Sequence, residues 1–220
     1  GLGNRNAFKS ALHAALEHAR RSGGHVALMF IDLDHFKRIN DNLGHEVGDL
    51  LLKAVALRLR EQVRAYDVVA RLGGDEFTIV LGDLEFSDDA GMVARKILNA
   101  LRQPFMLRDG LEVIVSASIG ISTFPECGED ADDLMRTADV AMYQAKRDGR
   151  NLHAFYLPEM NSRGHGTLML EQALRQAVES ESFVLHYQPQ IDLRTGCLVG
   201  LEGLMRWNHD ERMIEPSVFV

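Results

Sequence analysis

The sequence lacks the features that mark several common protein classes. Of its 220 residues only two are cysteines, Cys127 and Cys197, which lie 70 positions apart and form no CxxC motif. This excludes a disulfide-dense scaffold and a cysteine-based metal site. No apolar run reaches 18 residues, so no transmembrane helix is predicted. With a net charge of −8, a broad nucleic-acid surface is not expected either. We expect a soluble piece without membrane contact in a reducing, cytoplasmic compartment, although a parent protein could be membrane-anchored.

The residues that are abundant predict a packed core. The hydrophobic fraction of 46% is ample for one, and the apolar periodicity alternates between the two regular types of structure. Helices are predicted over 6–21, 45–64, 90–101 and 134–145, strands over 26–31, 111–122 and 152–156, and a hairpin with strands 68–72 and 77–81 around Gly73-Gly74. In the helix over 45–64 the predicted inner stripe is Val47, Leu50, Leu51 and Ala54. The pattern indicates an α/β (α+β) protein with a mixed or antiparallel sheet flanked by helices.

The residue composition of the sequence changes after Tyr156. A polar stretch over 157–167 reads as a linker or an interrupted helix, an amphipathic helix follows over 170–178, and two strands are predicted over 182–193 and 197–207. These elements are too few to close a core of their own. We therefore predict a first domain over 1–156, a linker over 157–167, and the incomplete beginning of a second domain over 168–220.

Acidic residues are placed where predicted strands end. Asp32 and Asp34 follow the strand over 26–31 and share a face if that strand continues through them, while Asp75 and Glu76 belong to the hairpin turn. If the hairpin and the strand are neighbours, Asp32 and Asp75 could share a Mg²⁺ ion, which accepts few carboxylates and leaves room for phosphate oxygens. The alternative, and on spacing alone the commoner case, is solvated charge at strand ends.

The stretch that follows is rich in side chains suited to a nucleotide. Lys37, Asn40, His45 and Asp49 surround the start of a predicted helix, whose free backbone N–H groups could bind phosphate. Lys37 could neutralise a polyphosphate, and an Asn with an Asp could read the edge of a purine. Each residue also has an ordinary alternative, because Asn is common in turns and caps and Lys on surfaces.

Several spaced motifs together resemble the GGDEF domain of diguanylate cyclases over residues 1 to about 156. They are "FIDLDHFKRINDNLGHEVGD", "RLGGDEF" and "AMYQAKRDGRN", with "GLGNR" similar to the family's TGLPNR turn except that Gly3 stands where proline is common. The resemblance implies a nucleotidyl-cyclase or polymerase-palm-like fold. It also implies a Mg²⁺ site, with Mn²⁺ as an alternative, made by Asp32, the backbone carbonyl of Leu33, and Asp75.

The resemblance further implies a reaction and the residues that perform it. Two GTP molecules would condense to cyclic di-GMP with release of two pyrophosphates, and two domains would have to meet in a homodimer. Asp75 and Lys37 would be catalytic, with Asp75 foremost a metal ligand. The residues implied to contact the nucleotide are Asn40, His45, Asp49, Glu76, Lys146 and Arg150, with Glu76 in the least certain role.

A second implied site would control the first. The segment "RAYD" matches the family's RxxD inhibitory site for cyclic di-GMP, with Arg64 and Asp67 as its contacts and Arg95 as an added one. An Arg can donate a bidentate pair to guanine, and an Asp can accept from its N–H groups. Out of this context an Arg and an Asp three residues apart are more often a surface ion pair.

The C-terminal stretch resembles the start of an EAL-type cyclic di-GMP phosphodiesterase domain, a TIM-like barrel. In "LHYQPQIDLRTGCLVGLEGLMRW" the resemblance makes Glu202 a metal ligand and Gln188 and Arg206 substrate contacts, and the rest of that site would lie beyond Val220. The expected parent is a GGDEF–EAL signalling protein with an upstream sensory region. Two functions stay open, an active cyclase and a catalytically silent GTP- or cyclic di-GMP-binding module that regulates a phosphodiesterase.

Overall fold

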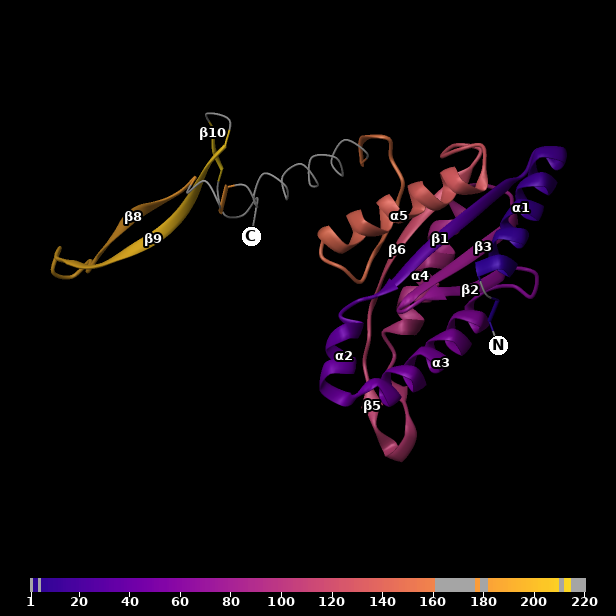
Figure 1. Ribbon diagram of the computed structural model, residues 1–220, viewed down its shortest axis with the longest axis horizontal. Coiled ribbons are helices and arrows are strands. Elements are labelled where there is room, and N and C mark those ends of the chain that lie inside the picture. The colour runs from indigo at the N-terminus through magenta and orange to yellow at the C-terminus, as the bar shows by residue number, and fades with distance from the viewer. Residues whose placement is uncertain (1, 4, 161–176, 179–181, 210–211, 215–220) are drawn as a thin grey trace. The chain divides into compact units, whose positions relative to one another are not determined.

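A computed structural model describes residues 2–3, 5–160, 177–178, 182–209 and 212–214. The chain divides into two compact units, Gly1–Met160 and Asn161–Val220. The first unit is built on a five-stranded sheet with the order β2-β3-β1-β6-β7 (Figure 1). Its strands are β1 (His25–Leu33), β2 (Val68–Gly73), β3 (Glu76–Leu84), β6 (Ala117–Phe124) and β7 (His153–Phe155). All neighbours are antiparallel except β6 and β7, so the sheet is mixed, as predicted.

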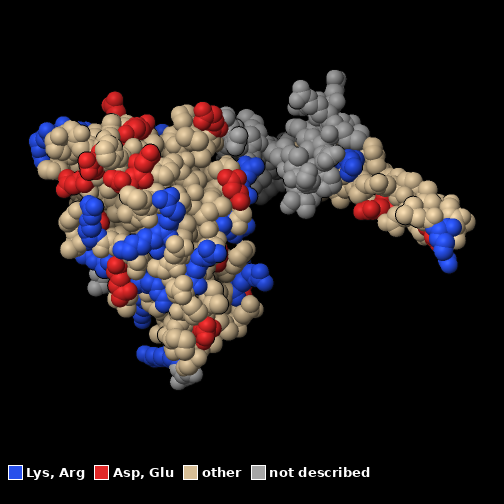
Figure 2. Space-filling view, turned by 180° about the vertical axis from the view of Figure 1, so that it is seen from behind, with Lys and Arg blue, Asp and Glu red and all other residues tan. Residues whose placement is uncertain are grey.

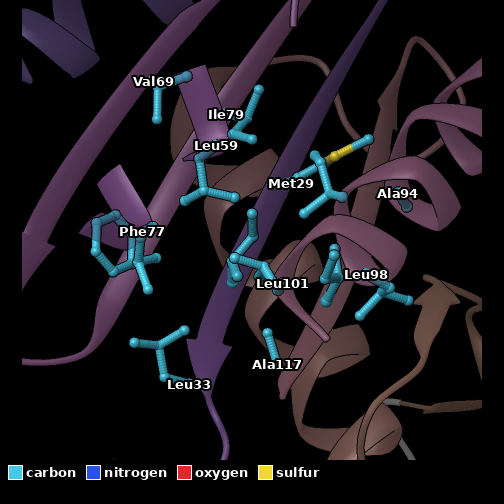
Figure 3. Packing of buried hydrophobic residues seen from close by; sticks show 14 of the residues in the cluster. Met29, Leu33, Leu59, Val69, Phe77, Ile79, Ala94, Leu98, Leu101 and Ala117 are labelled. Carbon is cyan, nitrogen blue, oxygen red and sulfur yellow. The ribbon is translucent and has the colours of Figure 1, made fainter. Parts of the chain in front are cut away.

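Helices cover both faces of this sheet. Alternate residues of β1 point to opposite sides, with Met29 and Ile31 in one buried cluster and Leu28 and Phe30 in the other. Helices α3 (His45–Gln62) and α4 (Asp89–Leu101) complete the first cluster (Figure 3), and α1 (Arg5–Ser22) and α5 (Ala131–Arg147) complete the second. A short helix, α2 (Phe36–Leu43), leads from β1 into α3. The central strand is therefore buried on both faces, which explains its continuous apolar run.

Three details differ from the sequence-based expectation. Helix α2 was not predicted as a separate element. The buried residues of α3 are Gly48, Leu51, Leu52, Val55 and Leu59. Of the predicted stripe, Leu51 is therefore buried, whereas Val47 and Ala54 are only partly buried against the same cluster. The strand predicted over 111–122 is two strands, β5 (Glu112–Val113) and β6. Strand β5 pairs with β4 (Phe105–Met106) across the turn η1 (Arg108–Gly110), apart from the main sheet.

The described part of the second unit is an open sheet. Strands β8 (Phe183–Ile191), β9 (Leu198–His209) and β10 (Arg212–Ile214) pair antiparallel in the order β10-β9-β8. The two predicted strands are confirmed, and an open sheet fits the incomplete beginning of a barrel. Most of the predicted helix over 170–178, and of the linker before it, lies outside the described residues.

The surface of the first unit carries both signs of charge. On the face shown in Figure 2, basic and acidic side chains are interspersed, and acidic side chains gather along the upper edge. Among the described residues, no helix combines the length and the apolar character needed to cross a bilayer.

A single arginine joins α3 to the end of α4. The Arg58 guanidinium lies 3.5 Å from the centroid of the Phe105 ring and donates hydrogen bonds to the carbonyls of Ala100, Gln103 and Pro104. Burial lowers the pKa of Arg58, and the charge of Glu61 partly opposes this. We expect Arg58→Ala to lower the free energy of unfolding by about 2 kcal/mol, since it removes a cation–π contact and the partners of several helix-terminal carbonyls.

Chemical denaturation followed by circular dichroism would measure this loss. Fluorescence is unsuitable because the single tryptophan, Trp207, lies in the second unit. Arg58→Lys is the matched control, because it keeps the charge but not the planar fork, and it should recover less than half of the loss. Equal stability of Arg58→Ala and the unmodified chain would contradict the stated role.

Candidate active site

The end of β1 and the β2–β3 hairpin lie side by side, which is the arrangement the metal hypothesis requires. In the antiparallel register Asp32 is directly opposite Glu76, and the backbone N–H of Leu33 donates to the carbonyl of Asp75 at 3.4 Å. Directly opposed residues of an antiparallel pair project to the same face. The structure thus brings both hairpin acids to Asp32, and it gives Glu76 a more central place than the sequence indicated.

The hairpin turn is held by its own backbone and by one arginine. Gly74 has φ +52°, a left-handed conformation that a side chain would strain. Arg71 donates from Nε and Nη2 to the Gly74 carbonyl at 2.9 and 2.7 Å. The pairing register shifts between Arg71 and Gly73. The turn therefore presents Asp75 and Glu76 from a fixed backbone.

Lys146 of α5 interacts with the carboxylates at the end of β1 and in the hairpin turn. Lys146, near the end of α5, places Nζ 2.8 Å from Oδ2 of Asp32, whose side chain is only 13% exposed. Burial raises the pKa of Asp32, the hydrogen bond and charge of Lys146 lower it, and the charges of Asp75 and Asp34 raise it again. Lys146, predicted to contact the nucleotide, is thus brought to the acidic group.

Glu76 shares this environment, together with an acid that the sequence reading missed. Burial raises the pKa of Glu76, the charges of Asp32, Asp139 and Asp75 raise it further, and Lys146 lowers it. Asp139 lies on α5 seven residues before Lys146, which is two helical turns and hence the same face. That spacing was the signal in the sequence that could have identified Asp139.

These groups fit a divalent cation of the Mg²⁺ type. Burial is the main cause of the raised pKa of Asp32, and the charge of Asp75 adds to it; a cation between the two carboxylates would relieve that repulsion. Within the described residues, no group of three or more His, Cys, Asp or Glu side chains is arranged to hold a metal. A cation would therefore rely on two carboxylates, a backbone carbonyl, and phosphate or water oxygens, which is the ligand set that Mg²⁺ accepts.

Strand β1 ends at Leu33, so Asp34 lies one residue beyond it. Its carboxylate is buried and accepts from Ser116 Oγ at 2.6 Å, Ser118 Oγ at 2.7 Å and the backbone N–H of Asn151 at 3.1 Å. The strand therefore does not continue through both acids, which was the condition for the expected shared face. Asp34 instead ties the end of β1 to β6 and to the loop between α5 and β7.

The predicted nucleotide contacts fall into two groups. Asn40 of α2 lies against α3, with Oδ1 buried and without a hydrogen-bond partner in the described part of the chain. His45 and Asp49 lie exposed at the start of α3, eight and four residues before the groove-lining Lys53. Lys37 and Arg150 are also exposed, and neither forms an ion pair within the described residues. Asn40 therefore packs against the start of α3. Lys37 and Arg150 make no contact with the carboxylates at the hairpin among the described residues.

A groove of about 980 Å³ lies beside the hairpin. The edge strand β2, the outer face of α3 and the N-terminal segment form its walls, and its lining includes Leu2, Leu52, Lys53 and Gly73. Leu52 and Lys53 follow Asp49 by about one helical turn, but Asn40, His45 and Asp49 are not among the residues that line the groove. Its lining is mainly apolar, as is typical of sites for small molecules.

The RxxD segment lines a second, smaller cavity, next to the start of β2. A cavity of about 400 Å³ is lined by Arg64, Asp67, Met92 and Lys96, whereas Arg95 is not among its lining residues. Asp67 accepts from the backbone N–H of Arg64 through Oδ2 at 2.8 Å, and its Oδ1 is buried without a partner among the described residues. Burial raises the pKa of Asp67, and the hydrogen bond from Arg64 lowers it.

In the second unit, two of the three predicted residues lie together. Gln188 of β8 and Glu202 of β9 are register partners, and Arg206 lies four residues farther along β9, opposite Val184. All three come from one hairpin, so the described strands supply only one wall of a site.

Comparisons with known proteins identify a family for each of the two units. Residues 1–152 match the family model described as "Diguanylate cyclase, GGDEF domain", and residues 171–220 match the "EAL domain" model. The phosphodiesterase NbdA of Pseudomonas aeruginosa, a "Cyclic di-GMP phosphodiesterase", is 41% identical over 221 residues, and "Bifunctional diguanylate cyclase/cyclic di-GMP phosphodiesterase MucR" of the same organism is 43% identical over 220. Both alignments cover 100% of this chain but only 28% and 32% of those proteins. The chain therefore spans about a third of the length of its curated relatives.

Two solved structures resemble the first unit. The crystal structure of the GGDEF domain of PA1120 (YfiN or TpbB) from Pseudomonas aeruginosa has a TM-score of 0.70 at 42% identity, covering 71% of this chain and 98% of that one. The GGDEF domain of DgcB from Caulobacter crescentus, solved in complex with c-di-GMP, has a TM-score of 0.65 at 29% identity and covers 70% and 91%. The palm-like arrangement expected from the sequence is thereby confirmed.

Proposed function

This chain belongs to the GGDEF diguanylate cyclase family, with the beginning of an EAL domain after it, and on that premise we propose that its first unit condenses two GTP molecules into cyclic di-GMP. The observation that carries the proposal is the convergence of Asp32, Asp75 and Glu76 at one sheet edge with Lys146 on Asp32. Convergent acids with a cation at the end of a strand suit phosphoryl chemistry, which depends on positioning and charge stabilisation.

The proposed reaction is two successive nucleotidyl transfers. The 3′-hydroxyl oxygen of one GTP forms a bond to the α-phosphorus of the other, the bond to pyrophosphate breaks, and the hydroxyl proton is released. Repetition with the roles exchanged closes the ring and releases the second pyrophosphate. Because one unit holds one GTP, two units must face each other, which makes a homodimer the active form.

The proposal assigns a role to each of these residues. Asp32, Asp75 and the carbonyl of Leu33 would hold Mg²⁺, which when bound withdraws charge from phosphate oxygens. Asn40 and Asp49 would bind the guanine beside the groove of α3 and β2, with His45 near the nucleotide. Lys37, Lys146 and Arg150 would neutralise phosphate charge, and Lys146 must exchange its contact with Asp32 for one with phosphate. Glu76, opposite Asp32, would support the same charge balance.

The test is a direct assay of this chain. GTP and Mg²⁺ incubated with the chain at high protein concentration should yield cyclic di-GMP and two equivalents of pyrophosphate, both measured by chromatography. ATP in place of GTP should give no cyclic product. Measurable GTP binding without any product would reject the cyclase and favour the alternative.

That alternative is a silent GTP- or cyclic di-GMP-binding module that regulates a phosphodiesterase. One relative with 41% identity is named a cyclic di-GMP phosphodiesterase, so a first unit of this kind occurs in a protein named for the opposite activity. The presence of Asp32, Asp75, Lys37, Asn40 and Asp49 favours the cyclase. In a parent that carries a complete EAL domain, Gln188, Glu202 and Arg206 would serve hydrolysis.

Product inhibition at the RxxD cavity would accompany the cyclase activity. The exposed Arg64 side chain donates to the Tyr66 hydroxyl at 2.7 Å, and the buried Oδ1 of Asp67 has no hydrogen-bond partner among the described residues. We expect Arg64→Ala to raise the concentration of cyclic di-GMP needed for half inhibition by about tenfold or more, since a bidentate pair with guanine contributes about 1–3 kcal/mol. Initial rates at increasing added product would measure it.

Tyr66→Phe is the matched control for this prediction. It removes the hydroxyl that competes for Arg64 and leaves the arginine in place, so inhibition should strengthen or stay unchanged. An Arg64→Ala enzyme inhibited as strongly as the unmodified one would remove the RxxD cavity from the proposal.

A further inference from the structure

Helix α3 has a notch at Gly48, where the absence of a side chain leaves space for a neighbouring residue. This glycine is buried and is the fourth residue of the helix, where alanine would stabilise the helix by about 1 kcal/mol. A Cβ atom at this position would overlap Oδ1 of Asn40 and would lie 3.0 Å from its Cγ and 3.2 Å from Cζ of Phe36. The missing side chain thus leaves the space that the Asn40 amide occupies.

The end of the Asn40 amide that lies in the notch is its oxygen. Oδ1 of Asn40 lies in it with no hydrogen-bond partner in the described part of the chain. An unsatisfied buried acceptor costs about 1–3 kcal/mol, so this arrangement needs a compensating reason. Because the two polar atoms of an amide point in different directions, the buried oxygen leaves the NH₂ group as the end available to a ligand.

We propose that Gly48 is a positioning residue that sets the orientation of Asn40, and through it the affinity and base selectivity of the nucleotide site. The inference rests on the proposed function, in which Asn40 and Asp49 bind the base. An outward NH₂ group matches the O6 and N7 acceptors of guanine, whereas adenine presents its own N6 donor at that edge. Asp49, the residue after Gly48, adds an acceptor for the N–H groups of guanine.

A double-mutant cycle tests the proposal. The dissociation constant for a non-hydrolysable GTP analogue would be measured by calorimetry for the unmodified chain, Gly48→Ala, Asn40→Ala and the double variant. In the chain that retains Asn40, Gly48→Ala should weaken binding about tenfold. In the chain that carries Asn40→Ala, the same substitution should weaken binding less than about twofold, because the side chain that the new Cβ atom would overlap is absent. Only the slight crowding of Phe36 would remain.

Two further measurements separate positioning from folding. The melting temperature of Gly48→Ala should be equal to or higher than that of the unmodified chain, and its binding of cyclic di-GMP at the RxxD cavity should be unchanged. A general loss of structure would lower both. If Gly48→Ala unfolds alone but folds together with Asn40→Ala, the overlap is demonstrated directly by rescue.

The outcomes also distinguish this inference from the proposed function. An unmodified chain that binds no GTP analogue overturns the proposed function and the inference with it. If the unmodified chain binds and Gly48→Ala binds equally well, or loses the same factor in both backgrounds, only the inference is wrong. Unfolding of Gly48→Ala in both backgrounds would likewise reject it, since the glycine would then serve packing alone.

Discussion

Replacing Asp32 with asparagine should lower the rate of cyclic di-GMP synthesis by about a thousandfold or more. The substitution keeps the shape of the side chain but removes the charge that both Lys146 and a metal ion would need. Loss of charge stabilisation worth several kcal/mol at the reacting phosphate corresponds to that factor, at about 1.4 kcal/mol for each tenfold. Initial rates at saturating GTP and Mg²⁺, followed by chromatography, would measure it.

Asp132→Asn provides the matched control. This carboxylate lies in the first turn of α5, and its side chain is 86% exposed and 3.7 Å from Lys9. It makes the same chemical change away from the hairpin, and activity should remain within about twofold, as for most surface substitutions. An Asp32→Asn chain that retains a tenth of the unmodified rate would contradict the metal assignment.

The hairpin shows why such a site can be only partly predicted from sequence. The spacing of apolar runs around Gly73-Gly74 predicted the turn, and the motif predicted that its acids meet Asp32. Which acid faces Asp32 depends on pairing register, and the register shifts between Arg71 and Gly73. Because a slip of one residue moves a side chain to the other face, no periodicity in the sequence could have placed Glu76 opposite Asp32.

The strands and helices show the same limit. Helices with a long apolar stripe, such as α4 and α5, were predicted within one to three residues of their ends. The segment over 111–122 reads as one apolar strand, yet the chain changes partners at Ser116, whose carbonyl accepts from the N–H of Asp34 at 2.9 Å. The side chain of Ser116 also donates to Asp34, which lies 82 positions earlier in the sequence. The residue pattern around Ser116 gives no indication of such a distant partner.

Removal of that partner is expected to have the largest effect on stability. Asp34→Ala should lower the free energy of unfolding of the first unit by about 3 kcal/mol, since it leaves two serine hydroxyls and a backbone N–H without their charged acceptor. The loss should be greatest in the loop between α5 and β7. There Arg150 and Asn151 have φ values of +62° and +51°, conformations that cost energy outside glycine and need support.

Hydrogen exchange would locate this effect, and denaturation would measure its size. The Asn151 amide donates to Asp34 at 3.1 Å, so its exchange should accelerate in Asp34→Ala by a larger factor than the amides of α4. Ser118→Ala, which removes one of the three donors, should cost about 1 kcal/mol and leave Asn151 protected. If the Asn151 amide exchanged at the unmodified rate in Asp34→Ala, the loop would be held by something other than this carboxylate. The predicted phosphate contact of Arg150 would then not depend on the end of β1.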